Sequence, residues 1–514
     1  MSVPRIIPAL SESQLTRLGA EIAFVARRGD LITLVGELGA GKTTLARAVI
    51  RALIGNGEEE IPSPTFTLVQ SYAGARMAAA HFDLYRLSMP SELDELGLDL
   101  ALREGIALVE WPERAGGGLP HERLEILIED ETEATRRLTL AGRGSWGERL
   151  ERFLAMRDIF QTAGMANGAW SLGYLQGDAS VRRYGRLQNT AGSSAVLMDW
   201  ARQPDGPAIR NGLPYSRIAH LAEDVRPFVA VAHMLRARGV SVPEIYAQDL
   251  EHGLLVLEDL GGRVFAAEVA AGAGNQAELW RAATDVLVKL QAESPPAELP
   301  VAAGEAAHHL PRYDSSALGI EVELLVDWYW QAVYGSPPPA DVRAEFLELW
   351  AEPFSFLDAL PPALVLRDYH SPNLLWLPER EGIARVGVID FQDAMQGPAA
   401  YDLVSLLQDA RVDVPPELEA DLLDHYCAQV AAQRADFDAE AFRFAYAALG
   451  AQRNTKILGI FARLAKRDGK PHYLAHIPRL WRYLERDLAH PKLSRLRSWY
   501  DRHLGAEARA GVPG

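Results

Sequence analysis

Residues 31–44 read Leu31-Ile-Thr-Leu-Val-Gly-Glu-Leu-Gly-Ala-Gly-Lys-Thr-Thr44, an apolar run followed directly by a glycine-rich segment. The second part matches the P-loop pattern, in which two glycines with four residues between them precede Lys and Thr. In this pattern backbone N–H groups close around phosphate oxygens, Lys42 reaches the β and γ phosphates, and Thr43 is a magnesium ligand. We therefore expect a strand, a phosphate-binding loop and a helix whose positive end faces the phosphates. The residues expected to hold the nucleotide are Gly36, Glu37, Leu38, Gly39, Ala40, Gly41, Lys42, Thr43 and Thr44.

The first 147 residues alternate between short β-branched runs and helix-forming stretches. Leu31–Val35, Ile106–Val109 and Leu124–Ile128 have the length and composition of buried strands. Strands that alternate with helices are typical of a parallel sheet with crossover helices. We expect an α/β domain of the P-loop NTPase class in this part of the chain.

Three further segments place acidic, hydroxyl and aromatic residues near the P-loop. They read Pro62-Ser-Pro-Thr65-Phe-Thr-Leu68, His81-Phe-Asp83-Leu-Tyr85-Arg86 and Val109-Glu110-Trp111-Pro-Glu113. Acids at strand ends beside a P-loop can hold a magnesium-bound water or orient the attacking water, and Asp83 and Glu110 fit these roles. Each of the two on its own would also fit a solvated acid at a strand end. Together with the P-loop, the segments resemble the TsaE family, the ATPase of bacterial tRNA threonylcarbamoyladenosine synthesis, over residues 10–142.

The resemblance to TsaE implies a small ATPase that uses ATP and Mg²⁺ and acts with the two partner proteins of the bacterial tRNA threonylcarbamoyl transferase complex. One partner carries the transfer chemistry, the other is a paralogous scaffold, and tRNA is contacted only indirectly. By position, Asp83 and Glu110 serve the metal and the water, Thr43 binds the metal, and Trp111 lies near the nucleotide. A core tryptophan is the alternative for Trp111. A nucleotide-switched scaffold is the alternative for the domain.

A second phosphate-transfer pattern lies between residues 365 and 393. Val365-Leu-Arg-Asp368-Tyr-His-Ser-Pro-Asn373 is followed by Val386-Gly-Val-Ile-Asp390, so Asp and Asn stand five residues apart between apolar strands. In kinases an Asp of the catalytic loop accepts the proton of the substrate hydroxyl, an Asn five residues later holds magnesium, and an Asp after the next strand binds the bridging metal. Asp368, Asn373 and Asp390 fit these three roles in order.

Two segments upstream support a kinase with two lobes. Gln176-Gly-Asp-Ala-Ser180-Val-Arg182-Arg183 lies where a loop over the phosphates is expected, and Leu254-Leu-Val-Leu-Glu258-Asp-Leu-Gly261 resembles the hinge between kinase lobes. The region from residue 152 to 488 resembles the aminoglycoside phosphotransferase-like kinases. Within them it is most similar to the AmgK-type sugar kinases, which phosphorylate the anomeric hydroxyl of N-acetylmuramate and N-acetylglucosamine in cell-wall recycling. The resemblance implies ATP, Mg²⁺, an amino-sugar substrate, and nucleotide contacts from Ser180, Arg182 and Glu258.

The chain departs from the general phosphotransferase pattern at two places. In the general pattern His-Gly precedes the catalytic Asp, whereas this chain has Leu366-Arg367 at those positions. A protein kinase carries its phosphate-binding Lys at the position where this chain has Met198. We expect Arg182 or Arg183 to supply the missing positive charge, although a solvated arginine pair would have the same sequence.

Two residues are expected to support the catalytic loop. His370 orders it, since Asp368 already occupies the position of the base. For Asp402 the resemblance suggests an acid at a helix start that supports the metal loop, and an ordinary helix cap is the alternative.

Local composition places the boundary between the two halves near residue 147. Residues 142–173 contain a glycine-bearing break, one helical stretch and small polar residues. Short strands up to residue 257 are then followed by long amphipathic stretches. We predict a P-loop ATPase domain over residues 1–147 and a kinase-like α+β domain. That second domain has a small lobe over residues 148–261 and a helical lobe over residues 262–514.

The overall composition excludes several classes of protein. The 514 residues carry 52 Lys and Arg against 69 Asp and Glu, and the resulting net charge of −17 opposes general affinity for nucleic acid or anionic lipid. No apolar run approaches the roughly 20 residues that span a bilayer. The single cysteine, Cys427, excludes an intramolecular disulfide and is expected to be packed in a helix. We expect a cytoplasmic protein without membrane contact.

Two alternatives stay open for the second half. It could be a kinase for an aminoglycoside, choline or another small alcohol, because the loop motifs indicate reaction type more firmly than substrate. It could also be a regulatory module that binds nucleotide without turnover. The missing Lys favours that module, and the retained Asp368, Asn373 and Asp390 argue against it. The prediction is a bifunctional chain: a tRNA-modification ATPase joined to a sugar-1-kinase.

Overall fold

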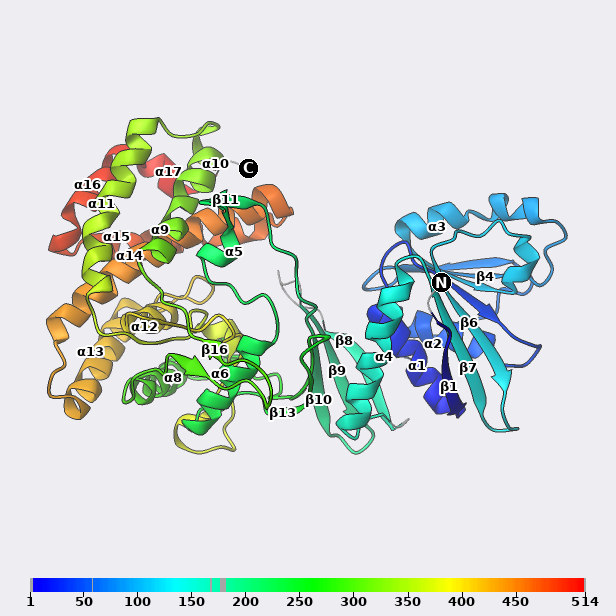
Figure 1. Ribbon diagram of the computed structural model, residues 1–514. Coiled ribbons are helices and arrows are strands. Elements are labelled where there is room, and N and C mark those ends of the chain that lie inside the picture. Colours follow the sequence, from blue (N-terminus) through cyan, green and yellow to red (C-terminus); the bar gives the residue numbers. More distant parts are fainter. Residues whose placement is uncertain (1–2, 58, 167–168, 176–181, 513–514) are drawn as a thin grey trace. The chain divides into compact units, whose positions relative to one another are not determined.

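The structure is a computed structural model that describes residues 3–57, 59–166, 169–175 and 182–512. By its internal contacts the chain divides into two compact units, whose elements are labelled in Figure 1. Unit 1 comprises Met1–Arg202 and Ile245–Asp259, and unit 2 comprises Gln203–Glu244 and Leu260–Gly514.

Unit 1 contains a seven-stranded sheet with the order β1-β7-β6-β2-β5-β4-β3. Its strands are β1 (Arg5–Leu10), β2 (Leu31–Val35), β3 (Val69–Tyr72), β4 (Ala78–Asp83), β5 (Gly105–Glu110), β6 (Arg123–Asp130) and β7 (Arg136–Arg143). The central strands β6, β2, β5 and β4 are parallel, as predicted. At the edges β1, β7 and β3 pair antiparallel, so the expectation of a parallel sheet is correct only for the centre. The short link between β6 and β7 allows a hairpin, whereas a parallel pair needs a crossover of a dozen or more residues.

Helices cover both faces of this sheet. Helices α1 (Glu12–Val25) and α2 (Lys42–Ile54) pack on the face that buries Ile32 and Leu34 of β2. The opposite face buries Leu31 under α3 (Leu98–Glu104). Successive side chains of a strand point to opposite faces, so the continuous apolar run of β2 is explained by burial on both sides. The P-loop follows directly from this fully buried strand.

A five-stranded antiparallel sheet with the order β13-β14-β10-β9-β8 forms the rest of unit 1. Its strands are β8 (Trp170–Leu175), β9 (Arg183–Asn189), β10 (Ser194–Asp199), β13 (Ile245–Asp249) and β14 (Leu254–Glu258). These are the short strands that the sequence predicted before residue 257.

Helix α4 (Trp146–Thr162) joins the two sheets of unit 1 into one hydrophobic core. Phe153 of this helix is buried in the same cluster as Ile126 of β6 and Leu197 of β10. The predicted boundary at residue 147 lies at the second residue of α4 and stays a prediction. The contacts themselves group the strands of the small lobe with the P-loop part.

Unit 2 is mostly helical (Figure 1). Its helices are α5 (Tyr215–Ile218), α6 (Arg226–Ala237), α7 (Phe265–Ala270), α8 (Gln276–Leu290), α9 (Ser315–Leu324), α10 (Trp330–Tyr334), α11 (Ala340–Asp358), α12 (Ala400–Leu407), α13 (Pro416–Gln433), α14 (Ala439–Asp468), α15 (Ile477–Leu488), α16 (Ser494–His503) and α17 (Ala506–Ala510). Its short strands are β11 (Ala208–Arg210), β12 (Leu213–Pro214), β15 (Glu298–Leu299), β16 (His308–His309), β17 (Ala363–Val365), β18 (Leu374–Trp376), β19 (Val386–Val388) and β20 (Met395–Gly397). The long helix α14 packs against α9, α12 and α15 and is buried along most of its length. The predicted catalytic loop connects β17 to β18.

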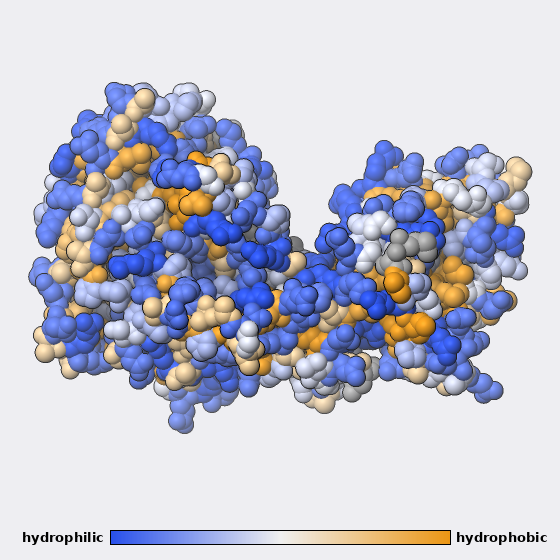
Figure 2. Space-filling model, in the orientation of Figure 1, coloured by the Kyte–Doolittle hydropathy of each residue, from blue (hydrophilic) through white to orange (hydrophobic). Residues whose placement is uncertain are grey.

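The surface of the described residues is mainly hydrophilic. Figure 2 shows hydrophilic residues over most of the visible face of each unit. Among the described residues, no helix is both long and apolar enough to cross a membrane. Cys427 is buried in α13, as expected.

Candidate functional site

The P-loop begins where β2 ends and closes onto the first turn of α2. A Cβ on Gly36 would lie 2.4 Å from the backbone oxygen of Ile128, so a side chain does not fit there. Gly41 is the N-cap of α2 and has a φ of 107°, a left-handed conformation that favours glycine. A Cβ on Gly39 would meet nothing within 4 Å, so the tip of the loop faces open space. This cradle, with the positive end of α2 behind it, fits the phosphates of ATP. Of the other predicted loop residues, Glu37 and Leu38 are exposed, Ala40 is buried, and Thr43 and Thr44 are half-buried.

Lys42 is buried and folded back onto the loop. Its Nζ donates hydrogen bonds to the carbonyl oxygens of Gly36 (2.7 Å) and Glu37 (2.9 Å). The same atom lies 3.9 Å from the centre of the Trp111 ring. Burial lowers the pKa of Lys42, and the nearby charge of Glu110 opposes that shift. Phosphate oxygens are stronger partners for an ammonium group than carbonyl oxygens, so these contacts can be exchanged when a nucleotide binds.

Glu110 links the P-loop to the neighbouring strand. Its Oε2 accepts a hydrogen bond from Oγ1 of Thr43 (3.1 Å), and its Oε1 lies 2.8 Å from Nε2 of the fully buried His81. A hydroxyl and a carboxylate side by side are oxygen ligands that fit Mg²⁺. The sequence prediction assigned no role to His81. Its position two residues before Asp83, on the same face of a strand, was the available signal.

Asp83 stands opposite Glu110, at the end of the adjacent parallel strand. Its carboxylate accepts hydrogen bonds from Oγ1 of Thr65 (3.0 Å) and from the backbone N–H of Tyr85 (3.1 Å). The ring of Tyr85 in turn lies 5.1 Å from that of Trp111, centre to centre. The structure therefore brings the three sequence segments around the P-loop together at the carboxyl ends of β2, β4 and β5.

The second site lies in unit 2, in the loop between β17 and β18. Nδ2 of Asn373 donates a hydrogen bond to the backbone oxygen of Asp368 (3.0 Å) and another to Oδ2 of Asp390 (3.4 Å). All three residues are half-buried, so their side chains are accessible. Arg367 and Asp390 have φ values of 71° and 63°, a conformation that costs a residue other than glycine roughly 1–3 kcal/mol. Contacts from the rest of unit 2 must hold this loop in place.

Two buried carboxylates bind the backbone of the loop. Asp402 of α12 accepts hydrogen bonds from the N–H groups of Leu366 (2.6 Å) and Arg367 (2.9 Å). Asp409 accepts hydrogen bonds from the N–H (2.8 Å) and the Oγ (2.5 Å) of Ser371. Burial raises the pKa of Asp402 to about 7. The geometry of Asp402 therefore favours support of the loop over an ordinary helix cap.

A third buried carboxylate, Glu321 of α9, neutralises two cations behind the loop. Its Oε1 accepts from Nη2 of Arg367 (2.5 Å) and from Nζ of Lys456 (2.7 Å). Burial opposes the charge of Glu321, but Lys456 and Arg367 outweigh it and lower its pKa to about 2. Burial likewise acts to raise the pKa of Asp368, but His370 and Arg367 outweigh it and the pKa lies below the usual value. Asp368 is therefore ionised at neutral pH, as a proton acceptor must be.

The five-stranded sheet of unit 1 carries residues that were predicted to contact the kinase nucleotide. Met198 is buried in β10, as the sequence indicated. Arg183 lies opposite Asp199 and forms an ion pair with it at 2.5 Å, so it is engaged within the sheet. The guanidinium of Arg182 lies 5.0 Å from the centre of the Trp200 ring, and its nucleotide contact stays a prediction.

Two other predicted nucleotide contacts also stay predictions. Ser180 lies outside the described residues. Glu258 is half-buried at the end of β14. The sequence analysis did not single out Arg186 of β9, which forms an ion pair with Asp259 beside Glu258 at 2.9 Å.

Two family models match the chain. Residues 172–445, which are more than half of the chain, match the model described as "Phosphotransferase enzyme family". The chain belongs to this family. Residues 9–138 match the model "Threonylcarbamoyl adenosine biosynthesis protein TsaE", so the phosphotransferase carries a TsaE-family domain ahead of its kinase region.

Individual relatives match each half of this phosphotransferase. The N-acetylmuramate/N-acetylglucosamine kinase of Caulobacter vibrioides is 42% identical over 350 residues, which are 65% of this chain and 92% of that protein. The tRNA threonylcarbamoyladenosine biosynthesis protein TsaE of Bacillus subtilis is 36% identical over 137 residues, 26% of this chain and 84% of that protein. Among solved structures, Bacillus YdiB is 31% identical and covers 31% of this chain and 98% of its own, with a TM-score of 0.26. The chain is thus a phosphotransferase joined to a TsaE-type ATPase, and its cofactors are ATP and Mg²⁺.

Proposed function

We propose that the kinase region transfers the γ-phosphate of ATP to the anomeric hydroxyl of N-acetylmuramate or N-acetylglucosamine. The grouping of Asp368, Asn373 and Asp390, with Asp368 held ionised by its neighbours, is the observation that carries the reaction. The substrate rests on the 42% identity to a kinase named for these two sugars.

Each residue of the group has a distinct part in this proposal. Asp368 orients the sugar hydroxyl and receives its proton, while Asn373 and Asp390 hold the metal. The bound Mg²⁺ neutralises charge on the phosphates. Asp402 and Asp409 fix the loop backbone, so Asp368 does not have to be ordered during the reaction.

A phosphate-transfer screen of the full chain tests the proposal against amino sugars, aminoglycosides and choline. Phosphorus NMR of the product should identify a sugar-1-phosphate. In Asp368→Asn, kcat should fall roughly 100- to 10,000-fold, the range of general-base catalysis, with nucleotide affinity nearly unchanged. Asp424→Asn, which changes an exposed carboxylate of α13, is the matched control and should retain activity. A 6-phosphate, or phosphorylation of an aminoglycoside or choline alone, would contradict the sugar-1-kinase assignment.

We propose further that the N-terminal domain is the ATPase that supports tRNA threonylcarbamoyladenosine formation together with two partner proteins. It would contact tRNA only indirectly, since the chain carries a net charge of −17. Large apolar side chains exposed beside the P-loop support a protein partner there: Leu38 and Phe66 are both 82% exposed. Cytoplasmic localisation belongs to the same proposal.

ATPase assays of the full chain with and without the two matching partners test this part. The partners should stimulate hydrolysis. Phe66→Ser should reduce the stimulated rate more than the basal rate, because the exposed Phe66 would contact a partner protein and not the phosphates. Tyr246→Ser, a comparable exposed aromatic of β13, is the control. Tight tRNA binding by the chain alone at physiological salt would contradict the indirect role.

A further inference from the structure

Helix α14 carries five consecutive buried polar residues, from Gln452 to Lys456. Four of them have partners. Gln452 donates to Glu321 (3.0 Å), Lys456 donates to Glu321 (2.7 Å), and Thr455 shares a hydrogen bond with the hydroxyl of Tyr500 (2.6 Å). Buried polar groups are normally satisfied in this way, and each of these four makes at least one hydrogen bond, although Oε1 of Gln452 and Oδ1 of Asn454 have no partner among the described residues.

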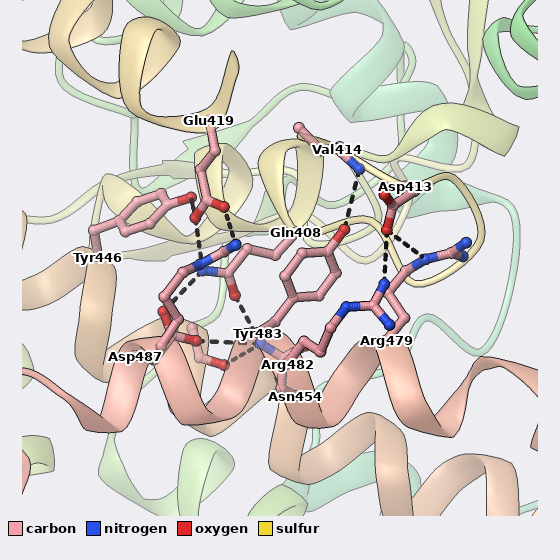
Figure 3. Close-up of polar contacts among 12 residues, drawn as sticks. Gln408, Asp413, Val414, Glu419, Tyr446, Asn454, Arg479, Arg482, Tyr483 and Asp487 are labelled. Atoms are coloured by element: carbon pink, nitrogen blue, oxygen red, sulfur yellow. Dashed lines mark hydrogen bonds and ion pairs between the residues drawn. The ribbon is translucent and has the colours of Figure 1, made fainter. Parts of the chain in front are cut away.

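Asn454, the fourth partnered residue, belongs to a separate polar network on the other side of the helix (Figure 3). Its Nδ2 donates to Oε1 of Gln408 (2.7 Å), and Nε2 of Gln408 donates to Glu419 (3.0 Å) and Asp487 (2.8 Å). Tyr446 completes the network with a hydrogen bond to Glu419 at 2.8 Å. Arg486 also pairs with Glu419, so the network extends to a half-buried cation.

Arg453 is the exception in the run. It is only 6% exposed, and its Nη1 is completely buried with no hydrogen-bond partner. No hydrogen bond or ion pair joins its guanidinium to any of the residues that the structure describes. A buried cation without a partner is strongly unfavourable, which means that some other group must compensate it.

Arg453 lies about one turn before Lys456 on α14, and Lys456 contacts Glu321 and the hydroxyl of Tyr401, which directly precedes Asp402. Arg453 therefore lies near the catalytic loop. Its charge acts on Asp368, His370 and Asp402, which belong to the loop or bind its backbone. Both carboxylate oxygens of Asp402 already accept backbone N–H groups of that loop. Two other cations near Asp368, Arg367 and Lys456, are neutralised by Glu321. Arg453 therefore presents a positive charge near the base that has no hydrogen-bonded counter-ion among the described residues.

We propose that Arg453 binds the carboxylate of an acidic sugar acceptor and thereby determines specificity for N-acetylmuramate. The inference rests on the proposed function, because N-acetylmuramate is N-acetylglucosamine with an added lactyl carboxylate. The phosphates of ATP arrive with a divalent cation, which Asn373 and Asp390 would hold. The lactyl carboxylate arrives without a counter-ion, and a guanidinium matches a carboxylate in geometry as well as charge.

The two sugars provide the test, because they differ only in the lactyl group, whose carboxylate is the charge that Arg453 would bind. With the full chain at saturating ATP, Arg453→Met should raise the KM for N-acetylmuramate roughly 10- to 100-fold, the effect of losing a charge-assisted hydrogen bond. The KM for N-acetylglucosamine should stay within about threefold, whereas any loss of kcat caused by the missing charge near Asp368 should be the same for both sugars. Arg453→Lys should recover part of the affinity for N-acetylmuramate. Arg467→Met, which removes an exposed arginine of the same helix that pairs with Asp468, is the matched control and should leave both sugars unaffected.

The possible failures are distinguishable. An equal rise in KM for both sugars in Arg453→Met would overturn the specificity role, since a contact with the transferred phosphate or a purely structural role does not discriminate between acceptors. Unchanged kinetics for both sugars would overturn it as well. A wild-type chain that phosphorylates neither sugar would overturn the proposed function, and this inference with it.

Discussion

The two phosphate sites of this chain are built in opposite ways. The P-loop takes its cradle and its lysine from nine consecutive residues, and the glycines determine its shape. The catalytic loop of the kinase is held by Asp402, Asp409 and Glu321, which stand 36, 38 and 46 residues from the loop positions that they bind. Backbone amides need only the right local conformation to bind phosphate. Asp368 is ionised beside the buried cation Arg367, which needs the remote carboxylate of Glu321 as its counter-ion, so that site depends on tertiary structure.

The largest effect that tests this comparison is expected when Glu321 is changed. Glu321→Gln leaves Arg367 and Lys456 as buried cations without their counter-ion, and breaking a buried pair typically costs about 3–5 kcal/mol. Urea unfolding of the full chain, followed by tryptophan fluorescence, should show a large loss of stability for unit 2. Nucleotide binding at the P-loop should persist at urea concentrations at which unit 2 has begun to unfold.

The control for this prediction lies on the same helix. Glu323 pairs with Arg210 and Arg343, whose side chains are 43% and 32% exposed. Glu323 is itself buried, but its two arginines can be hydrated when the carboxylate charge is lost, so Glu323→Gln should cost less than Glu321→Gln. Equal costs for the two variants would mean that the catalytic loop does not depend on buried charge.

A smaller effect is expected at the P-loop, where Lys42→Ala removes the cation from the cradle. The affinity for ATP should fall roughly 10- to 100-fold, since a charge-assisted hydrogen bond contributes about 1.5–3 kcal/mol. Calorimetry in an Asp390→Ala background isolates this site from the kinase site. Equal affinity with and without Lys42 would show that backbone groups alone bind the phosphates, which would sharpen the contrast between the two sites.

The last predicted effect is a difference in pH dependence caused by Asp402. Its pKa in the folded state is about 7, above its ordinary value of 3.8, so the folded state binds more protons than the unfolded state between these values. The contribution of the Asp402 proton to the stability of the folded state is complete below about pH 4 and is lost as the pH rises through 7. The Tm of the wild type should therefore fall relative to that of Asp402→Asn between pH 4 and 7. Asp424→Asn changes an exposed carboxylate and should follow the wild type; parallel curves for Asp402→Asn would contradict the raised pKa.

Much of both sites could be predicted from the sequence because their motifs are short and ordered. Residues 36–44 form the P-loop and the first turn of α2. Separately, Asp368, Asn373 and Asp390 lie close to one another, as their spacing indicated. The antiparallel edges of the first sheet were missed because apolar runs do not reveal strand direction. His81 was missed because a fully buried histidine has no periodic pattern of its own.

The sequence by itself determined the two chemistries, since glycine spacing and the Asp and Asn positions act over a few residues. Tertiary structure alone decided which remote side chains serve those motifs. Glu321 lies in an ordinary apolar helical stretch, and only packing brings it within 2.5 Å of Arg367. Arg453 stands between Gln452 and Asn454 in the sequence, yet both neighbours make side-chain hydrogen bonds and Arg453 makes none among the described residues. The physical reason is that burial and charge neutralisation are properties of a three-dimensional neighbourhood, to which residues far apart in sequence contribute.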